Sequence, residues 1–335
     1  MWYNKEVYWI KMHFAFENTE IYEIKEADMS LLEAIFMGIV QGLTEFLPVS
    51  SSGHLAMFKI LFGIETETGM LFDVLLHFGT LVAICMVFYK DVAKLIVEGI
   101  YILKNGLINL AIWVRNSFIR IKNMFQKDKL PEEELDLGKY HSVANSSYRK
   151  FVLLVIMSTI PTGIIGIIGK DMVEMASRIL IVLGICLVIT AILLFVADAA
   201  KGGEKLPKDI SYSNAFIIGI VQGVATLPGI SRSGSTITAC LLSGFNRSFA
   251  VKYSFIMSIP AILGAMLLEL KDFSVAALSM GEIVYYIIGM VIAGVVGYVC
   301  IKTMLVIVRN KKFKIFGIYC LIIGMISIIG HFYIV

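Results

Sequence analysis

Six stretches of the chain are apolar over about 20 residues, the length that a helix needs to cross a bilayer. They cover residues about 70–89, 151–169, 179–198, 249–268, 283–301 and 313–334. We expect the helix of the first stretch to continue to about 112 as a more polar extension. The pattern therefore predicts six transmembrane helices.

Two further apolar segments, at about 30–63 and 214–245, break in the middle at a cluster of Pro, Ser and Gly residues. Each half is too short to span a bilayer alone, so each segment is predicted to enter the membrane and return on the same side. Such irregular backbone at membrane depth needs surrounding protein or a watery cavity. We expect two re-entrant helix–loop–helix segments.

The composition agrees with an all-α integral membrane protein. The 335 residues are 58% hydrophobic and only 16% charged, whereas soluble domains carry about 25% charged residues. This excludes a water-soluble enzyme, a nucleic-acid binder and a disordered chain. A net charge of +3 is too balanced to indicate a partner. The five cysteines form no CxxC pair and are predicted to be small buried apolar residues.

Loop charge predicts the orientation. Lys and Arg residues concentrate in the loops at 114–150, 199–212 and 302–314, whereas the alternating loops are less basic. By the positive-inside rule the basic loops are cytoplasmic, so six crossings place both termini outside. Residues 1–28 form an N-terminal extension without assigned chemistry, and 29–335 form a single membrane domain.

The two interrupted segments contain an internal repeat. GIVQGLTEFLPVSSSG (38–53) aligns without a gap with GIVQGVATLPGISRSG (219–234), with identity at eight of sixteen positions. The topology places one copy on the outer side and the other on the inner side. We therefore predict an inverted repeat, with halves at about 30–170 and 179–335, whose binding site lies where the breaks meet.

The breaks carry the ionisable residues expected of a site. Gln41 and Glu45 lie one helical turn apart, and Thr226 takes the place of Glu45 in the second copy. The predicted catalytic residues are Glu45, Ser51, His54 and Arg232. The predicted substrate-binding residues are Gln41, Ser50, Ser52, Gly53, Gly229, Ser231, Ser233 and Thr236.

These residue types suit phosphoryl transfer. Arg232 and the free N–H groups of two helix N-termini favour phosphate oxygens. Glu45, with Gln41, can hold a hard divalent cation or act as a base. His54 can transfer protons, and Ser51 is a candidate nucleophile.

Structural roles compete with these assignments. The serines and glycines can serve helix packing, Glu45 can form a structural ion pair with Arg232, and His54 can be an N-terminal hydrogen-bonding residue. Thr236 can bond a backbone carbonyl. His77 stands four residues after Asp73, and a buried pair between them is favoured over a supporting role at the site.

QGLTEFLPVSSSGH (41–54) and LPGISRSGST (227–236) resemble the two signature motifs of the undecaprenyl-diphosphate phosphatase family, also called the bacitracin-resistance phosphatases. The resemblance covers essentially 29–335. By motif position, Gln41 and Glu45 match the family's acidic motif and Arg232 its phosphate-binding arginine. Ser51 and His54 match the catalytic serine and histidine candidates.

The resemblance implies hydrolysis of undecaprenyl diphosphate to the monophosphate carrier lipid of bacterial cell-wall polymers, with Mg²⁺ or Ca²⁺ as cofactor. It also implies an interlocked inverted repeat and a site open to the outer face of the cytoplasmic membrane. Gln41 in place of Glu weakens any two-carboxylate metal site, and the loop 114–150 looks longer than the family's usual core.

The expected partners are a polyprenyl diphosphate lipid and the bilayer, and the sequence leaves room for a homodimer. A carrier that moves a lipid phosphate or a small anion across the membrane is the alternative function, because inverted repeats are typical of transporters. A carrier would not need Glu45, Ser51 and His54 together.

Overall fold

The computed structural model describes residues 30–62, 69–126, 130–269, 280–309 and 312–334, so the predicted extension 1–28 lies outside the described residues. In these ranges the chain is all-helical, with twelve α-helices, one 3-10 turn (η1, Glu132–Glu134) and no β-strand beyond one isolated bridge. The first six helices are α2 (Leu31–Phe46), α3 (Ser51–Phe62), α4 (Gly69–Val87), α5 (Tyr89–Met124), α6 (Ser147–Ile168) and α7 (Lys170–Ser177). The others are α8 (Leu180–Ala199), α9 (Tyr212–Val224), α10 (Arg232–Leu242), α11 (Arg247–Glu269), α12 (Met280–Arg309) and α13 (Phe313–Ile334).

Six of these helices are long and apolar enough to cross a membrane, namely α5, α6, α8, α11, α12 and α13. Five coincide with predicted spans. The remaining predicted span corresponds to α4, a helix of 19 residues. The expected polar extension of α4 is instead a separate helix, because the chain is non-helical at Phe88 and α5 then continues to Met124.

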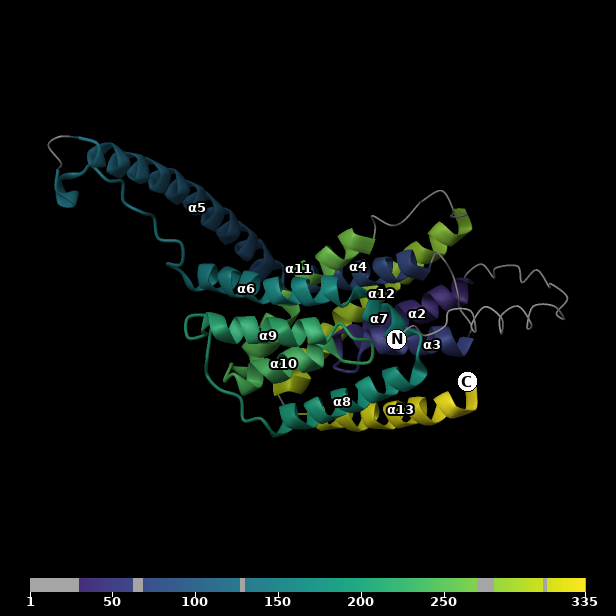
Figure 1. Ribbon diagram of the computed structural model, residues 1–335. Coiled ribbons are helices and arrows are strands. Elements are labelled where there is room, and N and C mark those ends of the chain that lie inside the picture. The colour runs from purple at the N-terminus through teal and green to yellow at the C-terminus, as the bar shows by residue number, and fades with distance from the viewer. Residues whose placement is uncertain (1–29, 63–68, 127–129, 270–279, 310–311, 335) are drawn as a thin grey trace, which may run out of the picture.

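The helices pack in a bundle in which segments distant in sequence lie side by side (Figure 1). Helix α8 runs along α13, α6 packs on α9, and α12 packs on both α2 and α4. Glycines allow these contacts, since a Cβ atom on Gly38 would lie only 2.6 Å from the carbonyl oxygen of Gly289. Small residues at such crossings are the usual means of close packing in membranes.

The segments that the sequence predicts to be interrupted are indeed pairs of short helices. The first is α2 and α3, with 16 and 12 residues, and the second is α9 and α10, with 13 and 11. At 1.5 Å per residue, none of the four reaches the ~30 Å of a hydrocarbon core. Both connecting turns lie inside the bundle, where Val49 and Ile230 are buried.

Candidate active site

The turn between α2 and α3 is built around Ser50. Pro48 cannot continue α2, and Ser50 then adopts φ = 71°, a left-handed conformation that costs free energy for a residue other than glycine. Hydrogen bonds hold it there, because its hydroxyl oxygen accepts from the Gly53 N–H at 3.3 Å and its carbonyl accepts from the His54 N–H at 3.2 Å.

The turn before α10 is capped in the same way. The Ser231 hydroxyl oxygen accepts from the Gly234 N–H at 3.1 Å, and the Ser231 carbonyl accepts from the Ser235 N–H at 2.9 Å. Ser50 and Ser231 are equivalent in the predicted repeat, so equal sequence produces equal capping at both turns. Each cap leaves the N-terminus of a helix facing the break, where negative charge is favoured.

The two turns touch each other. The Ser50 hydroxyl oxygen also accepts from the Gly229 N–H at 3.1 Å, and a Cβ atom on Gly53 would lie 2.7 Å from the Gly229 Cα. Gly229 has φ = +93°, which glycine adopts without strain. Thr190 of α8 clamps this turn by donating to the Gly229 carbonyl and accepting from the Ser231 N–H, both at 2.9 Å.

Glu45 is the centre of the site. One carboxylate oxygen, Oε1, accepts from Nη2 of Arg232 at 2.6 Å. The other, Oε2, accepts from the Ser51 hydroxyl at 2.5 Å and from the Gln41 amide at 3.2 Å. The Glu45 side chain is only 6% exposed, whereas Arg232 keeps 23% exposure. Residues from both motifs therefore meet at one buried carboxylate.

A small hollow adjoins this ion pair and reaches α11. Its lining consists of Glu45, Phe46, Arg232, Ser233, Ser254, Phe255 and Ser258. A carboxylate, a guanidinium and three hydroxyl groups thus border one space. The space measures about 10 Å³, room for about one water molecule, so an anionic ligand at Arg232 would have to widen it.

His54 is buried, and both of its ring nitrogens contact groups other than the Glu45 carboxylate. Its Nδ1 lies 2.7 Å from the Ser50 carbonyl, and its Nε2 lies 2.8 Å from the hydroxyl of Tyr319 on α13. The Nδ1 contact requires a proton on that nitrogen, because a carbonyl only accepts. The Ser51 hydroxyl is bonded to Glu45, so the group that contacts the candidate nucleophile is the carboxylate.

The remaining predicted binding residues, Ser233, Thr236 and Ser52, take different positions relative to the hollow. Ser233 borders the hollow. Thr236 is buried and bonds the Arg232 carbonyl at 2.8 Å and the Ser254 hydroxyl at 2.5 Å, which is the backbone contact that the sequence left as an alternative. Ser52 in the first motif lies 3.5 Å from the Ser50 hydroxyl.

His77 is brought to the site, whereas the sequence favoured a pair with Asp73. Its Nδ1 accepts from the Gln41 amide at 3.0 Å and lies 3.7 Å from Glu45 Oε2. Asp73 instead pairs with Lys59 at 2.5 Å. The site therefore contains the imidazole of His77 in addition to that of His54, although the sequence favoured a purely structural role for His77.

Three further residues were missed. Ser254 and Ser258 stand 181 positions after Asp73 and His77, the offset of the repeat, so extending the alignment into α4 and α11 would have found them. Tyr319 belongs to neither motif, and no sequence signal placed it near His54.

The oxygen atoms around Glu45 fit part of a cation site. The Gln41 Oε1 atom is buried without a hydrogen-bond partner, while the Gln41 amide group donates to Glu45. No group of three or more His, Cys, Asp or Glu side chains arranged for a metal occurs within the described residues. With the Gln41 amide turned so that Oε1 rather than the nitrogen faces Glu45, the protein could supply two oxygen ligands. Mg²⁺ commonly completes such a shell with water and substrate phosphates.

Comparison with known proteins identifies the family. A family model described as bacitracin resistance protein BacA matches residues 34–326. An undecaprenyl-diphosphatase of Methanosphaera stadtmanae is 40% identical over 303 residues, which cover 90% of this chain and 98% of that protein. Undecaprenyl-diphosphatases of Halothermothrix orenii and Alkaliphilus metalliredigens are each 38% identical, again over 90% of this chain and 98% of theirs.

The matched region contains both motifs and every side chain placed at the site, Tyr319 included. Together with the six apolar helices it indicates a multi-pass membrane protein. The chain belongs to the BacA family of bacitracin resistance proteins.

Proposed function

We propose that the chain is an integral-membrane phosphatase that hydrolyses undecaprenyl diphosphate to undecaprenyl phosphate and inorganic phosphate. The observation that carries the proposal is the contact of Arg232, from one motif, with Glu45, from the other, next to the Ser51 hydroxyl. Relatives of nearly equal length have the corresponding enzyme name. Recycling of the lipid carrier, and with it bacitracin resistance, follows from this activity.

Binding would begin at Arg232. Its guanidinium carries five donors in a planar fork, and the N-termini of α3 and α10 add backbone N–H groups. A diphosphate that reaches Arg232 would compete with Glu45 for the guanidinium. Exchange of one anionic partner for another keeps the arginine paired, so its positive charge is never left alone in a low-dielectric site.

Glu45 and Ser51 are placed for the chemistry. As the Ser51 oxygen attacks the terminal phosphorus, its proton passes to Glu45, with which it already shares a 2.5 Å hydrogen bond. The bond from that phosphorus to the bridging oxygen breaks, and the polyprenyl monophosphate leaves as an anion. The departing monophosphate takes this proton from Glu45, which is then ionised again. Water next attacks the phosphoserine phosphorus and passes a proton to Glu45. The bond from phosphorus to the Ser51 oxygen breaks, that oxygen takes the proton from Glu45, and inorganic phosphate leaves. Direct attack by a water molecule held at Glu45 remains the alternative route.

A divalent cation would be held by Glu45 and by the unpaired Oε1 of Gln41. When bound, it would neutralise phosphate charge and help to position the diphosphate. The single carboxylate makes a site that depends on oxygen atoms of the substrate for completion.

The inverted repeat and its orientation belong to the same proposal. Equal capping at Ser50 and Ser231, and the shortness of the four helices that flank them, support two re-entrant segments. The basic loop 199–212 and the entry into α6 lie at the same end of the bundle (Figure 1). We place this end in the cytoplasm, the site open to the outer face of the cytoplasmic membrane, and both termini outside. A homodimer stays a prediction.

The carrier alternative has no support of its own, because the relatives compared above have the name of a hydrolase.

The phosphatase proposal is tested by measuring phosphate release from undecaprenyl diphosphate by the purified full-length chain. We expect Arg232→Ala and Glu45→Ala to lower kcat/KM by at least about 100-fold, the usual loss when a charge-stabilising group is removed. The matched control is Arg120→Ala, which breaks an exposed ion pair with Glu132. Normal turnover by folded Arg232→Ala would contradict the assignment.

A further inference from the structure

Helix α5 leaves the bundle, and none of the side chains in its most apolar stretch is buried (Figure 1). It packs mainly on α6 and, at its start, on α4, where Asp91 also pairs with Lys252 of α11 at 2.9 Å. With 36 residues it is about 54 Å long. Length and composition would allow α5 to cross a membrane. Whether it does depends on which of its sides contact water and which contact lipid.

One side of α5 is covered by residues 130–142 of the same chain. Four asparagines bind the backbone of this segment, with Asn105 donating to the Ser142 carbonyl. The three others, Asn109, Asn116 and Asn123, each donate to a carbonyl and accept from the N–H of the same residue, at 2.7–3.0 Å. Their spacing of four and seven residues puts all four side chains on one side of the helix.

The covering segment has to lie in water. It contains Glu132, Glu133, Glu134 and Asp136, of which Asp136 pairs with Arg115 at 2.7 Å and Glu132 with Arg120 at 2.6 Å. Irregular backbone and carboxylates do not occur in the hydrocarbon core unless protein surrounds them. One side of α5 is therefore in water from Asn105 to Asn123, and α5 does not cross the membrane.

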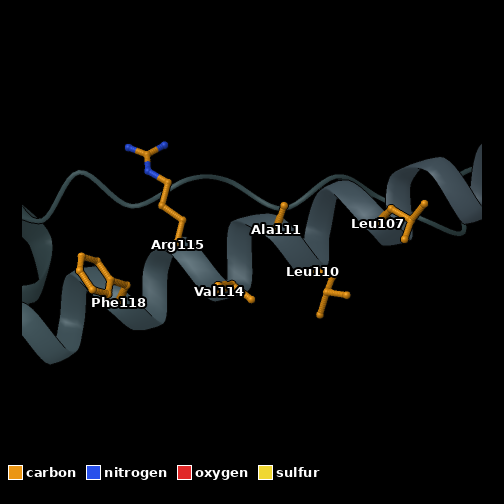
Figure 2. A pocket seen from close by; sticks show the side chains of 6 residues that line it. All are labelled: Leu107, Leu110, Ala111, Val114, Arg115 and Phe118. Carbon is orange, nitrogen blue, oxygen red and sulfur yellow. The ribbon is translucent and has the colours of Figure 1, made fainter.

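The opposite side of α5 is a continuous apolar stripe. Its residues recur every three or four positions, and each side chain is more than half exposed: Ile96, Ile100, Leu103, Leu107, Leu110, Val114, Phe118 and Ile121. Figure 2 shows Leu110 projecting on the side of the helix away from Arg115. Several of these residues line a shallow open hollow. A stripe of this size on a monomer normally meets a partner or a membrane.

Charge and position indicate the partner. Lys104 and Lys122 are exposed, and at about 100° per residue both fall on the same edge of the stripe. Trp113, a residue typical of membrane–water interfaces, lies on the other edge. Helix α5 starts two residues after the end of α4, which packs on the apolar helices α11 and α12. The stripe thus begins where the bilayer surface must be.

We propose that α5 lies along the predicted cytoplasmic surface of the membrane, with its apolar stripe in the acyl-chain boundary and Lys104 and Lys122 against anionic lipid headgroups. Residues 130–142 then form a water-facing cover along the helix. Amphipathic helices with this distribution of residues bury their apolar side by about 5–10 Å. The bilayer that surrounds the bundle is sufficient to cover the stripe.

The test measures lipid contact by fluorescence quenching in the full-length chain. The three tryptophans, Trp2, Trp9 and Trp113, are replaced by Phe. One variant then carries Leu110→Trp, on the stripe, and the matched control carries Tyr140→Trp, which is equally exposed but lies in the covering segment. Both are reconstituted into phosphatidylcholine–phosphatidylglycerol vesicles, with and without bromine on the acyl chains.

We expect acyl bromine to quench Leu110→Trp at least twofold and Tyr140→Trp hardly at all. Brominated phosphatidylglycerol should quench Leu110→Trp more than brominated phosphatidylcholine does, and Lys104→Gln with Lys122→Gln should abolish that difference. Leu107→Trp repeats the measurement at a second position of the stripe. The quenching does not depend on turnover, so this test is separate from that of the phosphatase.

Three results would overturn the proposal. Equal quenching at Leu110 and Tyr140 would place both α5 and the covering segment 130–142 in lipid. Absence of quenching at both Leu107 and Leu110 would place the stripe in water. Absence of quenching together with disulfide crosslinking of Leu110→Cys between copies would make the stripe an interface between two chains.

Discussion

The carboxylate of Glu45 receives hydrogen bonds from a guanidinium, a hydroxyl and an amide at the same time. A buried ion pair is worth little to stability unless its remaining lone pairs are satisfied, and here they are. The structural pairing with Arg232 and the proposed catalytic roles are therefore compatible, because the pair holds both side chains where a phosphate would arrive. The Ser51 hydroxyl bonds to Glu45, whereas the His54 ring bonds to Ser50 and Tyr319, so the two residues form separate hydrogen-bonded units.

Ser51→Ala tests the first unit. The change removes the hydroxyl that contacts Glu45 at 2.5 Å and leaves the cap at Ser50 intact. Single-turnover phosphate release should fall by at least about 100-fold if this oxygen is the nucleophile. A residual rate within tenfold of the unaltered enzyme would favour attack by water held at Glu45.

Tyr319→Phe tests the second unit. It deletes the hydroxyl 2.8 Å from His54 Nε2 and keeps the stacked ring, whose centroid is 5.6 Å from that of His54. Tyr319 is 40% exposed and the hydrogen bond is only partly buried, so its loss costs about 0.5–1.5 kcal/mol and we expect a slightly lower Tm. A several-fold fall in kcat at unchanged KM would show that His54 orientation matters to turnover. An unchanged Tm would contradict the contact.

At the scale of elements, the site depends on two turns that approach to backbone distance. The caps at Ser50 and Ser231 are local and follow from sequence. The contact between the turns is not local, since it needs α8 to hold Gly229 and Ser231 through Thr190. Helix α8 contributes no motif residue, yet it determines where Arg232 stands relative to Glu45.

Gly53→Ala should separate the turns. The added methyl group would lie 2.7 Å from the Gly229 Cα and 2.8 Å from its nitrogen, and backbone cannot move aside as a flexible side chain can. Overpacking of this kind costs about 1–3 kcal/mol. Tm and phosphate release should both fall. Gly264→Ala is the matched control, because a methyl group added there would meet no atom within 4 Å, and it should leave both unchanged.

Over the whole molecule, each half supplies what the other lacks. The first half provides Glu45, Ser51 and His54, whereas the second has Thr226, Arg232 and Ser235 at the corresponding positions. The buried carboxylate and the guanidinium that neutralises it therefore come from different halves. The long α5 and its covering segment 130–142 contribute no residue to this division of the site between the two halves.

The proposed cation site requires both Glu45 and the unpaired amide oxygen of Gln41. Treatment with a chelator should abolish phosphate release, and Mg²⁺ should restore it. Gln41→Ala should raise the Mg²⁺ concentration for half-maximal rate roughly tenfold, within the range seen when support for a metal ligand is lost. The control is Asn105→Ala, a change on α5 outside the site. Full activity in chelator would remove the metal from the mechanism.

The membrane environment, the all-α class of fold and the two motifs could be predicted from the order of residues along the chain. Apolar runs identified the long helices, and Pro, Ser and Gly identified the breaks, because these features depend on neighbours within a few residues. Glu45 and Arg232 could be selected because so few ionisable side chains lie in the apolar segments, and Ser51 because it lies in the serine-rich break three residues before His54.

Which side chains meet at the site follows from the packing of the folded chain. It brought His77 to Gln41 rather than to Asp73, turned His54 toward Tyr319, and placed Ser254 and Ser258 beside Arg232. It also showed that α5 stands clear of the bundle, covered on one side by residues 130–142. These outcomes depend on the packing of helices far apart in sequence, and helical periodicity fixes which side a residue occupies but not which helix faces it.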